Sequence, residues 1–158
     1  FAKAQMATRP ALPTEGNVFF SVKDEDKPAA AQIAKELVAL GFSLYSTQGT
    51  ACYLKEQGLP VKTLFKLSEG GRPNVDDLIK NDDIQLIINT PSGMLPRLDE
   101  NSMRAQAVQH GVCIFITLSG ARAALAAIRA IKEKPLHIEA IQEYTAETAC
   151  KETRAVNL

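Results

Sequence analysis

Two hydroxyls and a glycine lie where a buried strand is expected to turn into a helix, in the stretch Ser46-Thr47-Gln48-Gly49-Thr50. The first N–H groups of a helix have no intrahelical partner and lie at the positive end of its dipole, so a phosphate placed there gains several hydrogen bonds. Gly49 allows the backbone to approach closely, and the Thr47 and Thr50 hydroxyls can donate. Ser and Thr also cap ordinary helices. The stretch alone therefore predicts either an anion pocket or a simple cap.

Four further residues suit an anion and are spread over three other segments of the chain. Lys27 and Lys66 can neutralise a phosphate, and the Asn89 amide and the Ser92 hydroxyl can donate hydrogen bonds to it. Each lysine alone is more often a solvated surface charge, and an Asn that ends a buried strand often satisfies neighbouring backbone instead. Their meaning depends on whether the fold brings them together.

Hydrophobic periodicity predicts five strands that alternate with helices. Nearly continuous apolar strands joined by helices are typical of a parallel sheet covered on both faces, which is an α/β fold. The expected strands are 17–22, 42–46, 61–65, 84–88 and 112–117. The expected helices are 26–40, 50–57, 74–80, 102–110 and 121–131.

This arrangement places the anion-binding candidates on one edge of the sheet, because ligands of open parallel sheets bind beyond the carboxyl ends of the strands. Lys27 follows the first expected strand, residues 47–50 the second, Lys66 the third, and Asn89 and Ser92 the fourth. Charge-assisted hydrogen bonds are about twice as strong as neutral ones. The convergence favours a phosphate clamp over a simple helix cap.

The same loops offer little for catalysis. A nucleophile needs a nearby base, and acid–base chemistry needs a tunable His or carboxylate in the pocket. His110 and His137 are expected away from this edge. The acids at 24–26 and 76–77 are expected in first helical turns, where they favour the helix dipole. Glu69 is the remaining candidate base.

Composition restricts the class of protein further. With 158 residues the default is one domain, and 18 basic against 18 acidic residues argue against bulk electrostatic binding of nucleic acid or membrane. Three cysteines, Cys52, Cys113 and Cys150, are widely separated, so neither a structural metal site nor a disulfide framework is expected. Apolar runs are far shorter than the roughly 20 residues of a spanning helix, and no signal peptide is seen, which predicts a soluble, cytoplasmic protein.

Three ordered motifs resemble the methylglyoxal-synthase-like domain family, and more closely the C-terminal allosteric domain of carbamoyl phosphate synthetase large subunits. They are Ser46-Thr47-Gln48-Gly49-Thr50-Ala51, Glu69-Gly70-Gly71-Arg72-Pro73 and Ile87-Ile88-Asn89-Thr90-Pro91-Ser92-Gly93. Residues 1–5 also resemble the end of the ATP-grasp region that precedes this domain. The chain is thus expected to contain a linker from that region (1–16), the domain (17–143) and a C-terminal tail (144–158).

The resemblance implies a three-layer α/β/α domain with a five-stranded parallel sheet of order 3-2-1-4-5, which binds nucleoside monophosphates. In the family, uridine monophosphate (UMP) inhibits and inosine monophosphate (IMP) activates, and both use one pocket. Carried over by position, the phosphate and nucleotide contacts are Lys27, Thr47, Gly49, Thr50, Lys66, Asn89 and Ser92, the last replacing a hydroxyl that the family carries at Pro91. The positions that flank the base are Leu67, Val75 and Met103.

The resemblance also implies a parent enzyme with other domains that perform the catalysis. It is a glutamine-hydrolysing, ATP-dependent ligase of pyrimidine and arginine biosynthesis that uses Mg²⁺ and K⁺, whereas this domain itself is expected to hold no cofactor and no metal. The implied partners are UMP, IMP, the remaining domains of the large subunit, the glutaminase small subunit and oligomer contacts, with no nucleic acid and no membrane.

The alternative is a methylglyoxal-synthase-like lyase that acts on a triose phosphate. In those enzymes an Asp follows the paired glycines and a catalytic His follows the fourth strand. Here Arg72 follows Gly70-Gly71, and Pro96-Arg97-Leu98-Asp99 contains no His. These departures favour a binding module without catalysis. A purely structural domain with an empty pocket is the third interpretation.

Overall fold

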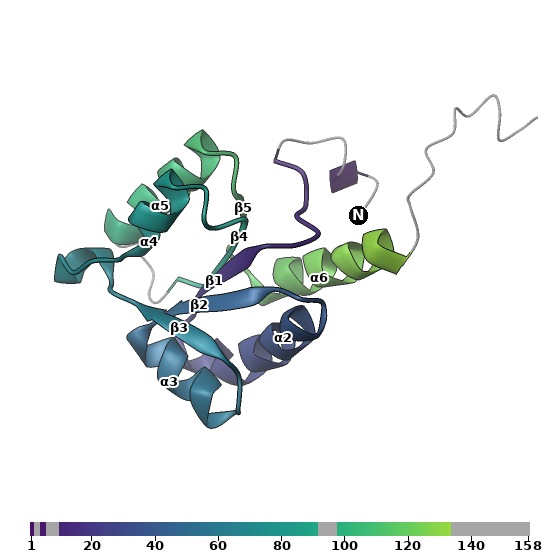
Figure 1. Ribbon diagram of the computed structural model, residues 1–158, viewed down its shortest axis with the longest axis horizontal. Coiled ribbons are helices and arrows are strands. Elements are labelled where there is room, and N and C mark those ends of the chain that lie inside the picture. The colour runs from purple at the N-terminus through teal and green to yellow at the C-terminus, as the bar shows by residue number, and fades with distance from the viewer. Residues whose placement is uncertain (2–3, 6–9, 92–97, 134–158) are drawn as a thin grey trace, which may run out of the picture.

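The computed structural model of the chain describes residues 1, 4–5, 10–91 and 98–133. Five strands and the helices between them form the domain (Figure 1). The strands are β1 (Asn17–Ser21), β2 (Ser43–Thr47), β3 (Val61–Leu64), β4 (Leu86–Asn89) and β5 (Cys113–Phe115). The α-helices are α2 (Lys27–Ala39), α3 (Gln48–Glu56), α4 (Val75–Lys80), α5 (Leu98–Gln109) and α6 (Leu118–Glu133). Two 3-10 turns, η1 (Asp24–Asp26) and η2 (Leu67–Glu69), follow β1 and β3.

All strand pairs are parallel, and their order is β3-β2-β1-β4-β5. Two helical layers cover the sheet, with α2, α3 and α6 on one face and α4 and α5 on the other (Figure 1). The three-layer α/β/α fold and the strand order expected from the sequence are therefore confirmed.

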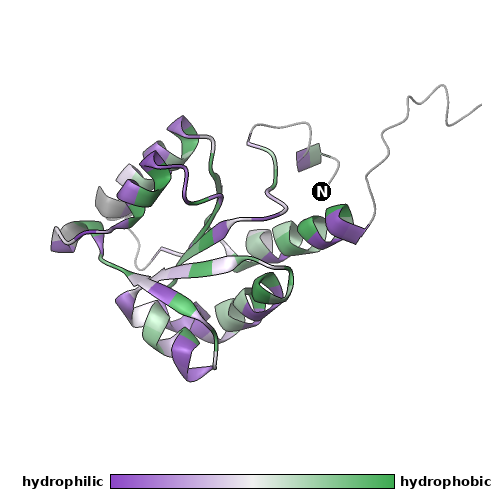
Figure 2. Cartoon of the chain, in the orientation of Figure 1, coloured by the Kyte–Doolittle hydropathy of each residue, from purple (hydrophilic) through white to green (hydrophobic). Residues whose placement is uncertain are grey.

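The central strands β1 and β4 carry consecutive apolar residues, Val18 to Phe20 and Leu86 to Ile88, because both of their faces are buried. In β1, Val18 and Phe20 belong to the core under α2 and α6, whereas Phe19 belongs to the core under α4 and α5. In β4, Ile88 likewise belongs to the core under α2 and α6, and Ile87 belongs to the core under α4 and α5. Figure 2 shows that β4 and β5 are largely hydrophobic, whereas β2, β3 and the surrounding helices carry hydrophilic residues as well. Alternating side chains of one strand thus supply two separate cores.

Three helices begin earlier than the periodicity predicts, and one of them, α6, starts at Leu118 instead of residue 121. Helix α3 starts at Gln48 because Thr47 is extended (φ −64°, ψ 153°) and serves as the N-cap, so Gly49 and Thr50 lie in the first turn. Helix α5 starts at Leu98 instead of residue 102. Its first turn, Leu-Asp-Glu-Asn, contains one apolar residue and hence no visible amphipathic pattern.

Part of the segment before β1 is packed against the domain. Leu12 is buried in the core under α2 and α6, and Lys132 Nζ of α6 donates to the carbonyl oxygens of Thr14 (2.8 Å) and Leu40 (2.7 Å). The boundary of the expected linker at residue 16 remains a prediction. The expected tail (144–158) and His137 lie outside the described residues. Among the described helices, none has the length and apolar character that a membrane crossing requires.

Candidate functional site

A cavity of about 330 Å³ opens where the carboxyl ends of β1, β2, β3 and β4 meet the first turns of the following helices. Every described residue that the sequence analysis selected for nucleotide binding lines it. These residues are Lys27, Thr47, Gly49, Thr50, Lys66, Leu67, Val75, Asn89 and Met103. Ser92 lies outside the described residues. The fold therefore brings the selected residues together, while their part in binding stays a prediction.

The turn from β2 into α3 leaves the Thr47 hydroxyl free to meet a ligand. Thr47 is the N-cap of α3, but its side chain makes no capping hydrogen bond. The simple cap that was the alternative interpretation is thus not formed by Thr47. Position 49 faces Lys27, because a Cβ built on Gly49 would lie 3.9 Å from Lys27 Nζ. A side chain at position 49 would consequently enter the space next to this ammonium group.

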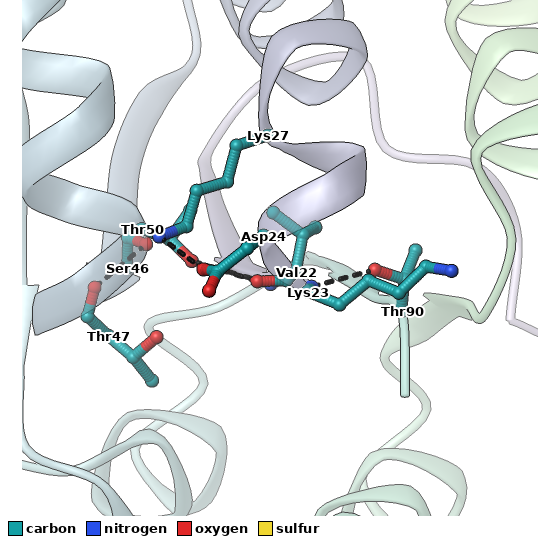
Figure 3. A network of polar contacts seen from close by, with 8 residues as sticks. All are labelled: Val22, Lys23, Asp24, Lys27, Ser46, Thr47, Thr50 and Thr90. Atoms are coloured by element: carbon teal, nitrogen blue, oxygen red, sulfur yellow. Dashed lines mark hydrogen bonds and ion pairs between the residues drawn. The ribbon is translucent and has the colours of Figure 1, made fainter. Parts of the chain in front are cut away.

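Two threonines contact the backbone of the residues that follow β1. Thr50 lies in α3, and Thr90 directly follows β4. The Thr50 hydroxyl accepts from the Val22 N–H and donates to the Val22 carbonyl oxygen, both at 3.4 Å, while Thr90 Oγ1 accepts from the Lys23 N–H at 3.1 Å (Figure 3). The Thr50 contacts are long for hydrogen bonds. They anchor the first turn of α3 to β1 without fully engaging the hydroxyl.

The lysines of the cavity differ in their partners. Lys27 Nζ lies 2.7 Å from Asp24 Oδ1 of the preceding turn, with the Lys27 side chain only 17% exposed and that of Asp24 92% exposed (Figure 3). The hydrogen bond from Lys27 is the main reason why the pKa of Asp24 is lowered. Lys66 has no ion-pair partner within the described part of the chain. Lys27 and Lys23 are therefore each held by an exposed carboxylate, Asp24 and Glu25, whereas Lys66 has no such partner among the described residues.

Asn89 presents an unused donor to the cavity. It ends β4 opposite Ser21 of β1 and is 1% exposed, yet its Nδ2 has no hydrogen-bond partner within the described ranges. An unsatisfied buried donor is destabilising by about 1–3 kcal/mol. Asn89 thus does not merely satisfy neighbouring backbone, and an acceptor in the cavity would remove this penalty.

The apolar end of the cavity contains a residue that the sequence analysis missed. Val75 and Met103 are almost fully buried there, and Phe65 lines the cavity although half of its surface is exposed. A Cβ on Gly71 would lie 2.4 Å from the Phe65 ring, so this position must remain glycine for the ring to lie where it does. Phe65 could have been noticed as an aromatic residue at the end of the third expected strand. The sequence analysis assigned it to that strand and gave it no place in the site.

Other missed lining residues come from segments that were examined for a different purpose. Asp24 is expected in a first helical turn, and the sequence analysis gives no role to Lys23 or to Thr90 beside Asn89. Glu100 precedes the helix expected at 102–110, whereas it lies in the first turn of α5. Glu100 could have been found from the sequence as an acidic residue close to the start of the helix that follows the fourth strand.

The candidates for catalysis lie outside the cavity. Glu69 is exposed, and its Oε2 accepts from the Lys66 N–H at 3.0 Å. Arg72 pairs with Asp77 at 3.2 Å near the start of α4, and His110 directly follows the end of α5. Within the described ranges, no group of three His, Cys, Asp or Glu side chains could hold a metal ion.

The chain belongs to the MGS-like domain family, whose sequence model matches residues 29–116, more than half of the chain. It is similar to the large chain of carbamoyl phosphate synthase from Rhodopirellula baltica, with 46% identity over 147 residues, and from Pseudomonas aeruginosa, with 47% identity over 134 residues. These alignments cover 93% and 85% of this chain but only 14% and 12% of those proteins. A third relative is the C-terminal section of the carbamoyl phosphate synthase large chain from Aquifex aeolicus, 43% identical, with 90% of this chain and 27% of that protein covered.

A solved structure supports the fold independently. The methylglyoxal synthase from Elizabethkingia anophelis NUHP1 superposes with a TM-score of 0.61 over 85% of this chain and 92% of that protein. The sequences are 16% identical, so this likeness concerns the fold alone. Together the comparisons confirm the family resemblance that the three motifs predicted.

Proposed function

We propose that this chain is the regulatory domain of a carbamoyl phosphate synthase large chain and that its cavity binds nucleoside monophosphates. UMP is the inhibitor and IMP the activator, and the ligand phosphate lies between Lys27, Lys66 and the first turn of α3. The observation that carries the proposal is the unpartnered Asn89 amide, which is buried in the same cavity as two lysines and a free Thr47 hydroxyl.

The arrangement suits binding better than turnover. A phosphate at the start of α3 meets free backbone N–H groups, two ammonium groups and a side-chain amide, each of which strengthens the binding of an anion. The described cavity lining contains no His or Cys, and of its two carboxylates Asp24 is exposed and paired with Lys27, while Glu100 has no side-chain partner among the described residues that could orient it as a base. The domain is therefore proposed to sense a nucleotide without transforming it.

Regulation follows from differential affinity. A nucleotide changes the activity of distant catalytic sites only if it binds two conformations of the whole protein unequally, and such coupling is typically 1–3 kcal/mol. Carbamoyl phosphate synthesis for the pyrimidine and arginine pathways, with ATP, Mg²⁺ and K⁺, is assigned to the remaining domains of the large chain and to a glutaminase subunit. The cytoplasm is the proposed compartment.

Calorimetry of the intact protein that contains this chain tests the proposal. We expect saturable binding of UMP and of IMP, each with one site per chain. Absence of binding of either nucleotide would contradict the proposal. The same preparation should not convert dihydroxyacetone phosphate into methylglyoxal above background, and turnover would indicate the lyase instead.

A further inference from the structure

The Oε2 atom of Glu100 is a second buried polar atom at the cavity that has no hydrogen-bond partner among the described residues. Glu100 lies in the first turn of α5 and lines the same cavity as Asn89. The residue is half-buried, and its Oε2 is inaccessible to solvent and accepts no hydrogen bond from the part of the chain that the structure describes. The cavity therefore contains an unused acceptor as well as the unused Asn89 donor.

The positive groups of the cavity do not satisfy this carboxylate. Lys27 and Lys23 are paired with Asp24 and Glu25, and within the described residues no lysine or arginine lies within ion-pair distance of Glu100. A buried charged acceptor without a partner is destabilising, and more so than a neutral one. The Glu100 carboxylate is consequently suited to accept a hydrogen bond from a ligand.

The position of Glu100 indicates which part of a nucleotide supplies that donor. Residues three apart on a helix lie on the same face, so Met103 is the neighbour of Glu100 one turn further along α5. Asn89 and Thr90, at the end of β4, line the cavity on the side where the strands end. A group beside Glu100 is thus placed between the polar strand ends and the apolar contact of Met103.

We infer that Glu100 accepts hydrogen bonds from the vicinal 2′- and 3′-hydroxyls of a ribose and so selects ribonucleotides over 2′-deoxyribonucleotides. The inference rests on the proposed function, in which the phosphate occupies the lysines and the base lies against Val75 and Met103. The sugar is the part of the ligand that joins these two ends. Carboxylates commonly accept from ribose hydroxyls in nucleotide-binding folds. No other described acidic side chain of the lining is buried, because Asp24 is exposed.

The test compares the affinities of the intact protein for UMP and for 2′-deoxy-UMP, in the wild type and in Glu100→Ala. A hydrogen bond to a charged group corresponds to about a tenfold or larger preference for UMP in the wild type. In Glu100→Ala the ratio of the two dissociation constants is expected to approach one. Glu100→Gln, which keeps an uncharged acceptor, should give an intermediate ratio and serves as the second variant if the alanine variant does not fold.

Asn101→Ala is the matched control, since Asn101 is an exposed neighbour of Glu100 on α5 and does not line the cavity. Its ratio should equal that of the wild type. Equal affinities of the wild type for UMP and 2′-deoxy-UMP, or a ratio unchanged in Glu100→Ala, would overturn the inference while leaving nucleotide binding intact. If the wild type binds neither UMP nor IMP, the proposed function fails and the inference fails with it.

Discussion

The cavity has two walls of different construction. The lysine wall consists of Lys27, Thr47, Gly49, Thr50 and Lys66, which lie at the end of β2 or in the segments after β1, β2 and β3. The helical wall consists of Val75 from α4 and of Glu100 and Met103 from α5. The lysine wall offers positive charge and donors, whereas the helical wall offers apolar surface and a single acceptor.

This difference separates two tasks that one binding site must perform. Charged donors recognise a phosphate, which all nucleotides share, so the lysine wall is expected to supply affinity. Apolar contact and a single acceptor depend on the sugar and base, so the helical wall is expected to supply selectivity. Substitutions in the lysine wall should accordingly weaken the binding of UMP and of inorganic phosphate alike, whereas substitutions in the helical wall should weaken the binding of UMP alone.

Lys66→Ala should have the largest effect on affinity. Lys66 is exposed and has no ion-pair partner in the described structure, so the substitution removes a free cation without leaving a carboxylate unpaired. We expect UMP and inorganic phosphate to bind more weakly by a similar amount, about 1–3 kcal/mol. Calorimetry on Lys66→Ala measures the loss, with Lys80→Ala as control because Lys80 is an exposed lysine outside the cavity. Unchanged affinity would mean that the phosphate is not held by this wall.

Thr47→Val should weaken binding by less, roughly 0.5–1.5 kcal/mol, the scale of a neutral hydrogen bond. The hydroxyl makes no capping bond, so its loss should leave the free energy of unfolding nearly unchanged. Parallel thermal denaturation and UMP titration check both expectations. A large drop in stability with normal affinity would show that Thr47 serves the fold and not the ligand.

Val75→Ala distinguishes the two walls directly. It removes apolar contact from the helical wall and should reduce UMP affinity by about 0.5–1 kcal/mol, a fraction of the transfer free energy of the lost methyl groups. Inorganic phosphate, which carries no base, should bind as to the wild type. If phosphate binding weakened equally, the proposed division of labour between the walls would be wrong.

Asp24→Asn should give the smallest change and in the opposite direction. Asp24 holds Lys27 and places a negative charge at the mouth of the cavity, so its neutralisation should tighten UMP binding, most clearly at low salt. The pKa of Asp24 is lowered from its ordinary value of 3.8, so the carboxylate is charged throughout the neutral range. The effect of the substitution should therefore be constant between pH 6 and 8 and fade only as the pH falls through the lowered pKa. Weaker binding by Asp24→Asn would instead indicate that Asp24 positions Lys27 for the ligand.

The lysine wall was predictable because each of its residues lies at the carboxyl end of a strand or in the segment that comes after it. In a parallel sheet the topology alone brings such residues to one edge, as it does for Lys27, Thr47 and Lys66. The apolar strands likewise predicted the layers of the fold. A strand that is buried on both faces has consecutive apolar residues, and this pattern is visible in β1 and β4.

The helical wall was harder to predict from the sequence. Val75 and Met103 were selected only through the family resemblance, since a buried apolar residue on a helix looks the same whether it lines a cavity or fills a core. Glu100 was missed because the polar first turn of α5 has no amphipathic pattern, and Phe65 because its place depends on the close approach of Gly71. These features depend on tertiary packing, which local patterns do not encode.

A competition titration tests the central claim most directly. The intact protein is titrated with UMP in the absence and in the presence of increasing IMP, and the apparent dissociation constant of UMP is recorded. A single phosphate seat between Lys27 and Lys66 predicts that this constant rises in proportion to the IMP concentration and without limit. A constant that levels off or does not change would mean that the two nucleotides occupy different sites, and it would contradict the account.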